Sequence, residues 1–287
     1  MRARIAYDIL NQTLGHHVKT VDPVSTEGDR AALEAVHAAA YVRSVLDEGI
    51  SGEWDGPSLR NAQTALTMFS GTMRLTEALI AGDTNVGFNP MGAKHHAGYD
   101  FSSGFCVFND MAWAALEFKK AGLRPLYLDW DVHAGDGVQN LLEATDIPTL
   151  SIHGSGIFPM GMGNHAPNAW GETHTWHNPE KHFYNWNIEL GSGDDALMSA
   201  LAEAEEIVDV YSPDVILLAT GADGHEGEAW GMKWTLDGYI EAAHTVSTWA
   251  GKFLVGGAGG YQPRTMTPAI WAAVIQDIYR TLPRKSK

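Results

Sequence analysis

The sequence has a single cysteine, Cys106, among its 287 residues. One cysteine excludes an intramolecular disulfide framework and a zinc module built from several cysteines. Positive charge is scarce as well, because 19 Lys and Arg residues stand against 35 Asp and Glu, for a formal net charge of −16. A chain this acidic is a poor candidate for binding a nucleic-acid backbone, which requires a basic surface, and it suits a cationic substrate better.

Long apolar segments and linkers are also absent. No run approaches the roughly 20 apolar residues of a membrane-spanning helix, and the first residues, Met-Arg-Ala-Arg-Ile, lack the apolar stretch of a signal peptide. No repeat, low-complexity tract or Ser/Pro-rich linker divides the chain. We therefore expect residues 1–287 to form one domain of a cytoplasmic protein with no membrane or nucleic-acid partner. Nothing in the sequence indicates the oligomeric state.

Short apolar strands alternate with helical segments along most of the chain. Strands bounded by turn-forming residues are expected at 123–129, 147–152, 214–220 and 252–256. Helices are expected near 29–48, 58–81, 107–121, 194–211, 235–250 and 268–281. This alternation predicts an α/β fold in which helices cover both faces of a parallel sheet, and such sheets bind ligands at the carboxyl ends of their strands.

Residues 154–182 interrupt the alternation. The segment holds five glycines, three prolines, two tryptophans and four histidines. So long a loop in a compact domain is usually functional. The plainest interpretation is a solvated flap, and the alternatives are a wall or lid of an active site or a second metal site made from the histidines.

Candidate metal ligands follow two of the predicted strands. Asp131 and His133 lie two residues apart after strand 123–129, so an extended backbone points both side chains the same way. Asp223, after strand 214–220, offers a third ligand. Two carboxylates and an imidazole suit a divalent metal. Taken singly, each fragment is also explained by a strand-end hydrogen bond or a helix N-cap.

Two other fragments stand near strand ends. His95 and His96 precede a glycine-rich turn, and a glycine run at 256–260 leads to the phenol of Tyr261. Glycines allow the backbone to approach a ligand closely. Adjacent histidines are often surface residues and a glycine run is often a plain turn, but four such fragments, each beside a predicted strand end, favour one shared site.

In this order the fragments resemble the motifs of the histone deacetylase family, which includes bacterial acetoin-utilisation-type deacetylases and acetylpolyamine amidohydrolases. The matching motifs are His95-His96-Ala97, Ser103–Asp110, Asp129–Gly137, Gly221–Asp223 and Gly256–Tyr261, with Val36–Val42 resembling the family's early helix. The resemblance covers most of the chain. It implies a three-layer α/β/α arginase-like fold around a mostly parallel sheet, with one catalytic zinc ion.

The resemblance also implies a role for each matching residue. Three match the zinc ligands: Asp131, His133 and Asp223. Five match the residues that act on the substrate: His95, His96, Asp129, Asp136 and Tyr261. In this assignment the two aspartates hydrogen-bond the two histidines, and the tyrosine polarises the substrate carbonyl.

Further positions match the substrate channel and a second ion. Gly104, Phe105 and Phe158 match parts of the acyl-lysine channel. Trp230 stands where polyamine-preferring relatives tend to place an acidic residue, which favours acetyl-lysine, although the nearby Glu226 and Glu228 oppose that inference. The family's structural potassium site matches Asp129, Asp131, His133, Ser151 and Ile152.

The chemistry expected of such a site is hydrolysis of an N-acyl amine. Three protein ligands leave zinc one open position, where it lowers the pKa of a water and polarises the amide oxygen. Tyr261 donates to that oxygen as it becomes an oxyanion, and His96 takes the water proton and passes it to the leaving amine. His95 acts through its charge. Zinc is expected, and iron(II) is the alternative because it accepts the same ligands.

Acetyl-lysine of a protein or peptide is the expected substrate, with an acetylpolyamine or a small N-acetyl metabolite as the alternative. Two positions depart from the family's pattern. Ala134 replaces a second histidine that is not a ligand, so we expect altered surroundings and not an inactive enzyme. Lys94 replaces a usual Gly or Leu and is expected to face solvent. Asp55 is a candidate for an aspartate that anchors the substrate at the rim.

Two other functions share parts of this pattern. A two-metal ureohydrolase on the same fold requires a D-x-H-x-D run, in which Gly135 takes the place of the last aspartate. A non-catalytic acyl-lysine reader is disfavoured because the ligands and Tyr261 are all present.

Overall fold

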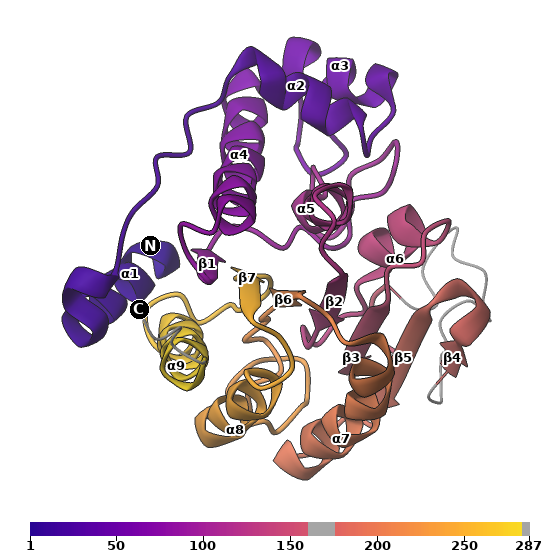
Figure 1. The fold of residues 1–287 in the computed structure, drawn as a ribbon. Helices are drawn as coiled ribbons and strands as arrows, with labels where there is room; N and C mark the ends of the chain where they lie inside the picture. Colours follow the sequence, from indigo (N-terminus) through magenta and orange to yellow (C-terminus); the bar gives the residue numbers. More distant parts are fainter. Residues whose placement is uncertain (160–175, 283–287) are drawn as a thin grey trace.

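The computed structural model describes residues 1–159 and 176–282, and within them seven strands form one sheet (Figure 1). In spatial order they are β1 (Val86–Asn89), β7 (Lys252–Gly256), β6 (Val215–Ala219), β2 (Pro125–Asp129), β3 (Thr149–Gly154), β5 (Phe183–Ile188) and β4 (Trp176–Asn178). Neighbours are parallel except β4, which pairs antiparallel with β5 at the edge. The predicted α/β fold with a mostly parallel sheet is confirmed.

The central strands end at the same level. Asp129 of β2 pairs with Ala219 of β6, and Ala219 pairs with Gly256 of β7. Because parallel strands place their carboxyl ends along one edge, the segments that follow these three residues emerge side by side. This register brings the predicted ligands after β2 and β6 next to the glycine run after β7.

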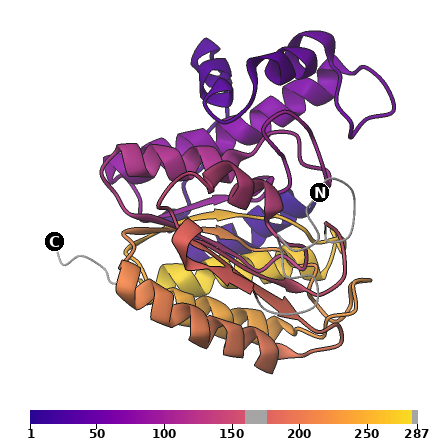
Figure 2. The same ribbon diagram turned by 90° about the vertical axis from the view of Figure 1, so that its right-hand side faces the viewer.

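Helices cover both faces of the sheet, which makes three layers (Figures 1 and 2). One face carries α4 (Leu59–Ala81), α5 (Asp110–Lys120) and α6 (Asp136–Leu142), with α2 (Glu27–Glu34) and α3 (Ala39–Glu48) beside α4. The other face carries α7 (Asp194–Tyr211), α8 (Leu236–Val246) and α9 (Met266–Thr281), with α1 (Arg2–Leu14) against α9.

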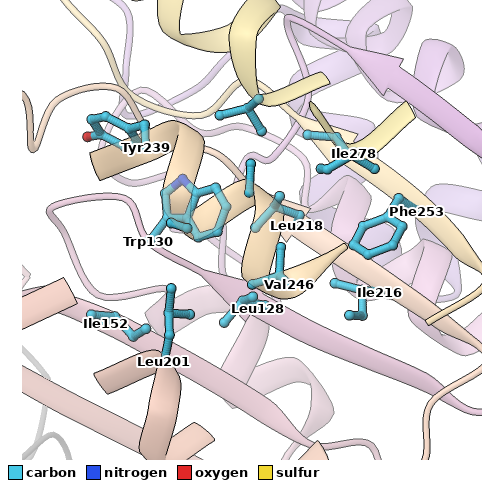
Figure 3. Packing of buried hydrophobic residues seen from close by; sticks show 14 of the residues in the cluster. Leu128, Trp130, Ile152, Leu201, Ile216, Leu218, Tyr239, Val246, Phe253 and Ile278 are labelled. Carbon is cyan, nitrogen blue, oxygen red and sulfur yellow. The ribbon is translucent and has the colours of Figure 1, made fainter. Parts of the chain in front are cut away.

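Alternating side chains of the central strands fill two hydrophobic cores. Along β6, Ile216 and Leu218 join the core under α7, α8 and α9, whereas Val215 and Leu217 join the core under α4 and α5. Figure 3 shows the first of these cores, in which Trp130 also packs. Burial on both faces explains why these strands are continuous apolar runs in the sequence.

The four predicted strands correspond to β2, β3, β6 and β7. The prediction missed β1, which is short and contains a glycine, and the polar strands β4 and β5. The single helix predicted near 29–48 was wrong, because α2 and α3 are separate helices. Between them the backbone leaves helical geometry, and the Ala38 N–H donates to the carbonyl of Tyr99. Helices α1 and α6 were not predicted.

Of the long loop predicted at 154–182, residues 160–175 lie outside the described residues, so the expectations of a lid and of a second histidine site there stay untested. The remainder contributes β4 and a short 3-10 turn at Pro179–Lys181. Among the described residues, no helix combines the length and apolarity needed to cross a membrane.

Candidate active site

Three side chains of ligand type meet beyond the carboxyl ends of β2 and β6. Asp131, His133 and Asp223 each offer an atom within 4.8 Å of the others, and all three residues are buried. His133 Nδ1 lies 3.0 Å from Asp131 Oδ1 and 3.2 Å from Asp223 Oδ2. The structure thus brings together the three residues that the sequence suggested as metal ligands.

Backbone amides from two loops hold the two carboxylates of this triad in place. The Gly259 N–H donates to Asp131 Oδ2 over 2.6 Å, and the Val132 N–H donates to Asp223 Oδ1 over 3.1 Å. A Cβ on residue 259 would collide with both carboxylates, so the close approach of this loop requires glycine. The loop after β7 therefore closes the triad from the side opposite β2.

The electrostatics of the triad fit a bound cation. Burial raises the pKa of Asp223 to about 6, and the negative charge of Asp131 adds to the rise. Burial opposes protonation of His133, but the two carboxylates outweigh it and raise its pKa to about 10. Asp223 Oδ2 is buried and receives no well-aligned hydrogen bond from the described residues. Because two carboxylates buried side by side are costly unless a cation neutralises them, a divalent metal fits this donor set.

Two histidine–carboxylate pairs stand beside the triad. His95 Nδ1 lies 2.7 Å from Asp129 Oδ2, and His96 Nδ1 lies 2.6 Å from Asp136 Oδ1. The two imidazole rings have centroids 3.9 Å apart. His95 Nε2 lies 3.9 Å from Asp131 Oδ1, so the pair borders the candidate metal site directly.

The two histidines differ in charge. Burial would lower the pKa of His95, but the carboxylates of Asp129 and Asp131 outweigh it and raise the pKa to about 9. Burial lowers the pKa of His96, and the positive charge of His95 lowers it further. At neutral pH the arrangement therefore favours a cationic His95 beside a neutral His96, which is a pairing suited to proton transfer by His96.

The loop that carries the histidines is fixed by residues whose roles the sequence did not reveal. Asp110, the first residue of α5, accepts the N–H groups of Ala93 (3.0 Å) and Lys94 (2.8 Å). His37 links this loop to the start of α5. Its Nδ1 is 2.8 Å from the Gly98 carbonyl, and its Nε2 accepts the Asn109 N–H at 2.9 Å. Both Asp110 and His37 lie within motifs that carried the family resemblance, and that was their only signal.

A buried tyrosine extends the first histidine pair. The Tyr127 hydroxyl donates to Asp129 Oδ2 over 2.6 Å, and the other oxygen of Asp129 accepts the Asp131 N–H at 2.8 Å. Both oxygens of Asp129 therefore have hydrogen-bond partners, which fixes the orientation of this carboxylate and, through it, that of the His95 ring. Tyr127 lies in β2, two residues before Asp129, and its sequence context did not predict this role.

Tyr261 lies in the loop after β7 and lines the same cavity as Asp131 and His133. Its side chain is 46% exposed, and its ring centroid lies 6.2 Å from that of Trp230. Burial of the hydroxyl raises the pKa of Tyr261, and the negative charges of Asp131 and Asp223 add to the rise. The phenol thus remains a hydrogen-bond donor at neutral pH.

The expected channel residues lie around the histidines. Trp230 packs its ring against His133, with centroids 4.5 Å apart, and Phe158 packs against His96 at 4.8 Å. A Cβ at Gly104 would collide with the His96 ring. Phe105 is 75% exposed, so it stands at the opening.

A cavity of about 390 Å³ joins these elements, and its lining includes His95, His96, Asp131, His133, Phe105 and Tyr261. Two cationic side chains also line it. Lys94 was expected to face solvent, and this expectation was wrong, because the backbone hydrogen bonds to Asp110 present residue 94 to the cavity. Arg2 was not predicted to belong to the site.

Other suggested residues lie at the edges of the site. Asp55 is exposed and does not line the cavity, whereas its neighbour Glu53 accepts the N–H of Phe105 over 2.7 Å. The residues suggested for potassium come from two adjacent strands and the loop after the first, since Asp129 of β2 pairs with Ser151 of β3 and Asp131 and His133 follow β2. The Ser151 hydroxyl accepts the Gly135 N–H at 3.3 Å, and the ion itself stays a prediction.

Comparison with known proteins places this geometry in context. Residues 1–278 match the family model of the histone deacetylase domain. The chain is 31% identical over 269 residues to the acetoin utilization protein AcuC of Bacillus subtilis, covering 84% of this chain and 67% of that protein. It is 28% identical over 252 residues to histone deacetylase 8 of Xenopus tropicalis, covering 85% of this chain and 63% of the relative.

The chain spans only 41% of a third relative, histone deacetylase 6 of Arabidopsis thaliana, with 32% identity over 201 residues. Among solved structures, acetylpolyamine aminohydrolase from Burkholderia pseudomallei superposes with a TM-score of 0.78 at 21% identity. That match covers 98% of this chain and 90% of the other, and it establishes the similarity of fold.

Proposed function

Because the chain belongs to the histone deacetylase family, we propose that it is a metal-dependent amidohydrolase that removes the acetyl group from acetyl-lysine in proteins or peptides. The observation that carries this proposal is the meeting of Asp131, His133 and Asp223 beside two histidine–carboxylate pairs in one cavity. Family and geometry support the same reaction class from independent directions.

The triad would hold one divalent metal, zinc by preference and iron(II) as the alternative. Such an ion supplies a Lewis acid that polarises the amide oxygen and lowers the pKa of a water. The second position after His133 is Gly135, which offers no carboxylate to hold a second metal as a ureohydrolase would. A structural potassium ion and a cytoplasmic location belong to the same proposal.

His96 is the proposed general base and acid. Its Nδ1 is paired with Asp136, which leaves Nε2 as the nitrogen that takes the proton of the attacking water. The same nitrogen then returns the proton to the leaving amine. His95, held by Asp129, contributes a positive charge beside the reacting carbonyl.

Tyr261 is the proposed donor to the carbonyl oxygen as it gains negative charge. Removing a single donor of this kind typically costs about 2.7–4 kcal/mol of transition-state stabilisation. Gly104, Phe105 and Phe158 would enclose the acyl-lysine side chain, with Trp230 as a neutral wall near the opening.

An acetylpolyamine is the second candidate substrate, and one observation favours it. Carboxylates stand near the opening, because Glu53 bonds the backbone of Phe105 and Glu228 bonds that of Tyr261. A cationic polyamine would be attracted to them. The solved neighbour from Burkholderia pseudomallei is named for acetylpolyamine, which supports testing this class.

The decisive experiment measures acetate release by zinc-loaded protein from an acetyl-lysine peptide and from an acetylated polyamine, with Tyr261→Phe in parallel. Turnover of the peptide that collapses in Tyr261→Phe is the expected result. Preference for the polyamine would assign the second candidate. Zinc binding at one ion per chain with no turnover of any acylated amine would instead support a non-catalytic reader.

A further inference from the structure

Lys94 and Arg2 place two positive charges on the cavity that also holds the candidate metal ligands, and we call these two residues the cationic wall. Lys94 directly precedes His95, and its backbone is tied to Asp110. Arg2 donates from Nη1 to the carbonyl of Gly260 over 2.6 Å, and its guanidinium carbon lies 4.9 Å from the centroid of the Trp271 ring. Arg2 is therefore anchored at its guanidinium and Lys94 at its backbone, and both residues line the cavity.

Neither cation is neutralised by a direct ion pair. In the part of the chain that the structure describes, no carboxylate oxygen approaches Lys94 Nζ or the Arg2 guanidinium within 4.0 Å. Burial lowers the pKa of Arg2, while the acidic groups of Tyr261, Asp223 and Asp131 oppose the change. Arg2 therefore lies near the triad and feels its charge without forming a salt bridge.

The ammonium group of Lys94 acts on the interior of the cavity. Burial raises the pKa of Cys106 to about 12, and the positive charge of Lys94 is the main influence that opposes this rise. Cys106 is 5% exposed, whereas its neighbour Phe105 is 75% exposed. Phe105 therefore stands at the opening of the cavity and Cys106 deeper in it, and Lys94 lines the same cavity close enough to act on the Cys106 thiol.

A metal at the triad changes the charge balance of the cavity. Its two positive charges would match the two carboxylates of Asp131 and Asp223, which leaves Glu228 as the remaining carboxylate that acts on Arg2 and gives the cationic wall an excess of positive charge. A cavity with low-dielectric walls and uncompensated positive charge concentrates anions. Lysine and arginine side chains both bind carboxylates through charge-assisted hydrogen bonds.

We propose that the cationic wall binds a carboxylate at the far end of the acyl group, so that the protein also hydrolyses amides of short dicarboxylic acids, such as N-succinyl-lysine. This inference rests on the proposed amidohydrolase function. The cavity volume of about 390 Å³ lies in the range of pockets that enclose drug-sized ligands, which leaves room for an acyl group longer than acetyl.

The reaction balances without any additional reagent. The oxygen of one water forms a bond to the amide carbon, the C–N bond breaks, and the proton lost by the water goes to the leaving nitrogen. The products are succinate and the free lysine amine, and nothing is oxidised or reduced.

The test compares two substrates that differ only in charge. A succinyl-lysine peptide and its succinamoyl counterpart, in which the terminal carboxylate is an amide, have nearly the same shape. We expect zinc-loaded wild-type protein to show a kcat/KM at least about tenfold higher for the succinyl peptide, because one charge-assisted hydrogen bond suffices for this factor. Lys94→Met should bring the ratio close to one, and Lys94→Arg should retain it.

The ratio is internal to each preparation, so partial loss of folded protein in Lys94→Met does not affect it. Lys120→Met, which removes an exposed lysine of α5 paired with Glu117, serves as the matched control and should keep the wild-type ratio. A wild-type ratio near one, or an unchanged ratio in Lys94→Met, would overturn the proposal.

A binding measurement separates this inference from the proposed function. Calorimetry with zinc-loaded protein compares succinate with succinamate, which share one carboxylate and differ at the other end. Tighter binding of succinate that depends on Lys94 supports the cationic wall even where no peptide is hydrolysed, and in that case the amidohydrolase proposal fails alone. If the protein hydrolyses acetyl-lysine but binds the two anions equally, the amidohydrolase proposal is supported and the proposed carboxylate-binding site is disproved.

Discussion

Glu228 accepts the backbone N–H of Tyr261 over 2.8 Å and so ties the loop after β6 to the loop after β7. The same oxygen accepts the N–H of Gln262 at 3.1 Å. Tyr261 is 46% exposed, so little packing holds it, and these two hydrogen bonds join the contact of Arg2 with the Gly260 carbonyl in fixing its backbone. We infer that Glu228 positions Tyr261.

This relationship predicts the effect of changing Glu228. Glu228→Ala should lower kcat about five- to thirtyfold, which corresponds to about 1–2 kcal/mol for a lost hydrogen bond to a charged acceptor. Glu228→Gln keeps an acceptor oxygen and should recover most of the loss. In a Tyr261→Phe background, Glu228→Ala should cost little more, because the residue it positions is already disabled. Additive losses in this double-variant cycle would contradict the positioning role.

Gly259 is predicted to be essential for metal binding. A Cβ there would collide with the carboxylates of Asp131 and Asp223, so Gly259→Ala must displace the loop or the ligands. We expect zinc affinity to fall at least about tenfold, the low end of the loss reported for disturbed ligand surroundings. A competition assay with a fluorescent zinc chelator measures it. Gly251→Ala is the matched control, since nothing lies within 4 Å of a Cβ at that position, and equal affinities in both variants would refute the prediction.

Zinc should raise the thermal unfolding midpoint of the protein. A ligand present at a thousandfold excess over its Kd adds about 4 kcal/mol to the free energy of unfolding, provided that it binds only the folded state. Differential scanning calorimetry of chelator-treated protein, with and without added zinc, detects the shift. Asp223→Asn removes one carboxylate of the triad and should lose most of it. A full shift in this variant would place the metal elsewhere.

Acid is predicted to destabilise the protein partly through His37. Burial lowers the pKa of His37 to about 4, below its usual value of about 6.5. The unfolded chain therefore binds a proton that the folded protein refuses between these two values. The free energy of unfolding should fall as the pH drops from about 6.5 to 4, by on the order of 3 kcal/mol from this residue.

Urea unfolding at pH 7 and pH 5 tests this, with His37→Gln as the comparison. Glutamine does not titrate, so the difference in unfolding free energy between the two pH values should be smaller in the variant than in the wild type. The buried His153, whose pKa is also lowered to about 4 by burial, titrates in both proteins and leaves the comparison intact. Identical pH dependence in the two proteins would disprove the role of His37.

The sequence predicted the central strands because both of their faces are buried. Strand β6 has the sequence Val-Ile-Leu-Leu-Ala, a continuous apolar run that is typical of a buried strand. Strand β5 has the sequence Phe-Tyr-Asn-Trp-Asn-Ile, whose polar residues made it harder to predict as a strand. The motifs after β2 and β6 indicated the metal ligands because spacing and residue type are local properties. How these segments meet depends on the register of three strands, which no local pattern encodes.

The position of Lys94 could not be predicted from its neighbours in the sequence. A lysine in an exposed loop normally faces solvent, and that expectation was wrong because Asp110, from another element, holds the N–H groups of residues 93 and 94. Ala93 has a φ of 57°, an uncommon backbone conformation that turns the chain at this point. The place of residue 94 on the cavity lining thus depends on a contact between residues distant in the sequence, as does the placement of Arg2 against Gly260.

Two hydrogen bonds that close the triad join residues far apart in the sequence. Val132 and Asp223 are separated by 91 positions, and Gly259 and Asp131 by 128. Loops of this length close late in folding, since contacts distant in sequence are the slow ones to form. A chain still being synthesised lacks the amide of Gly259 until β7 has left the ribosome. Because Asp131, His133 and Asp223 all precede β7, a translation product that ends before β7 would carry the three candidate ligands without the amide of Gly259, and we expect it to bind a metal more weakly than the full chain.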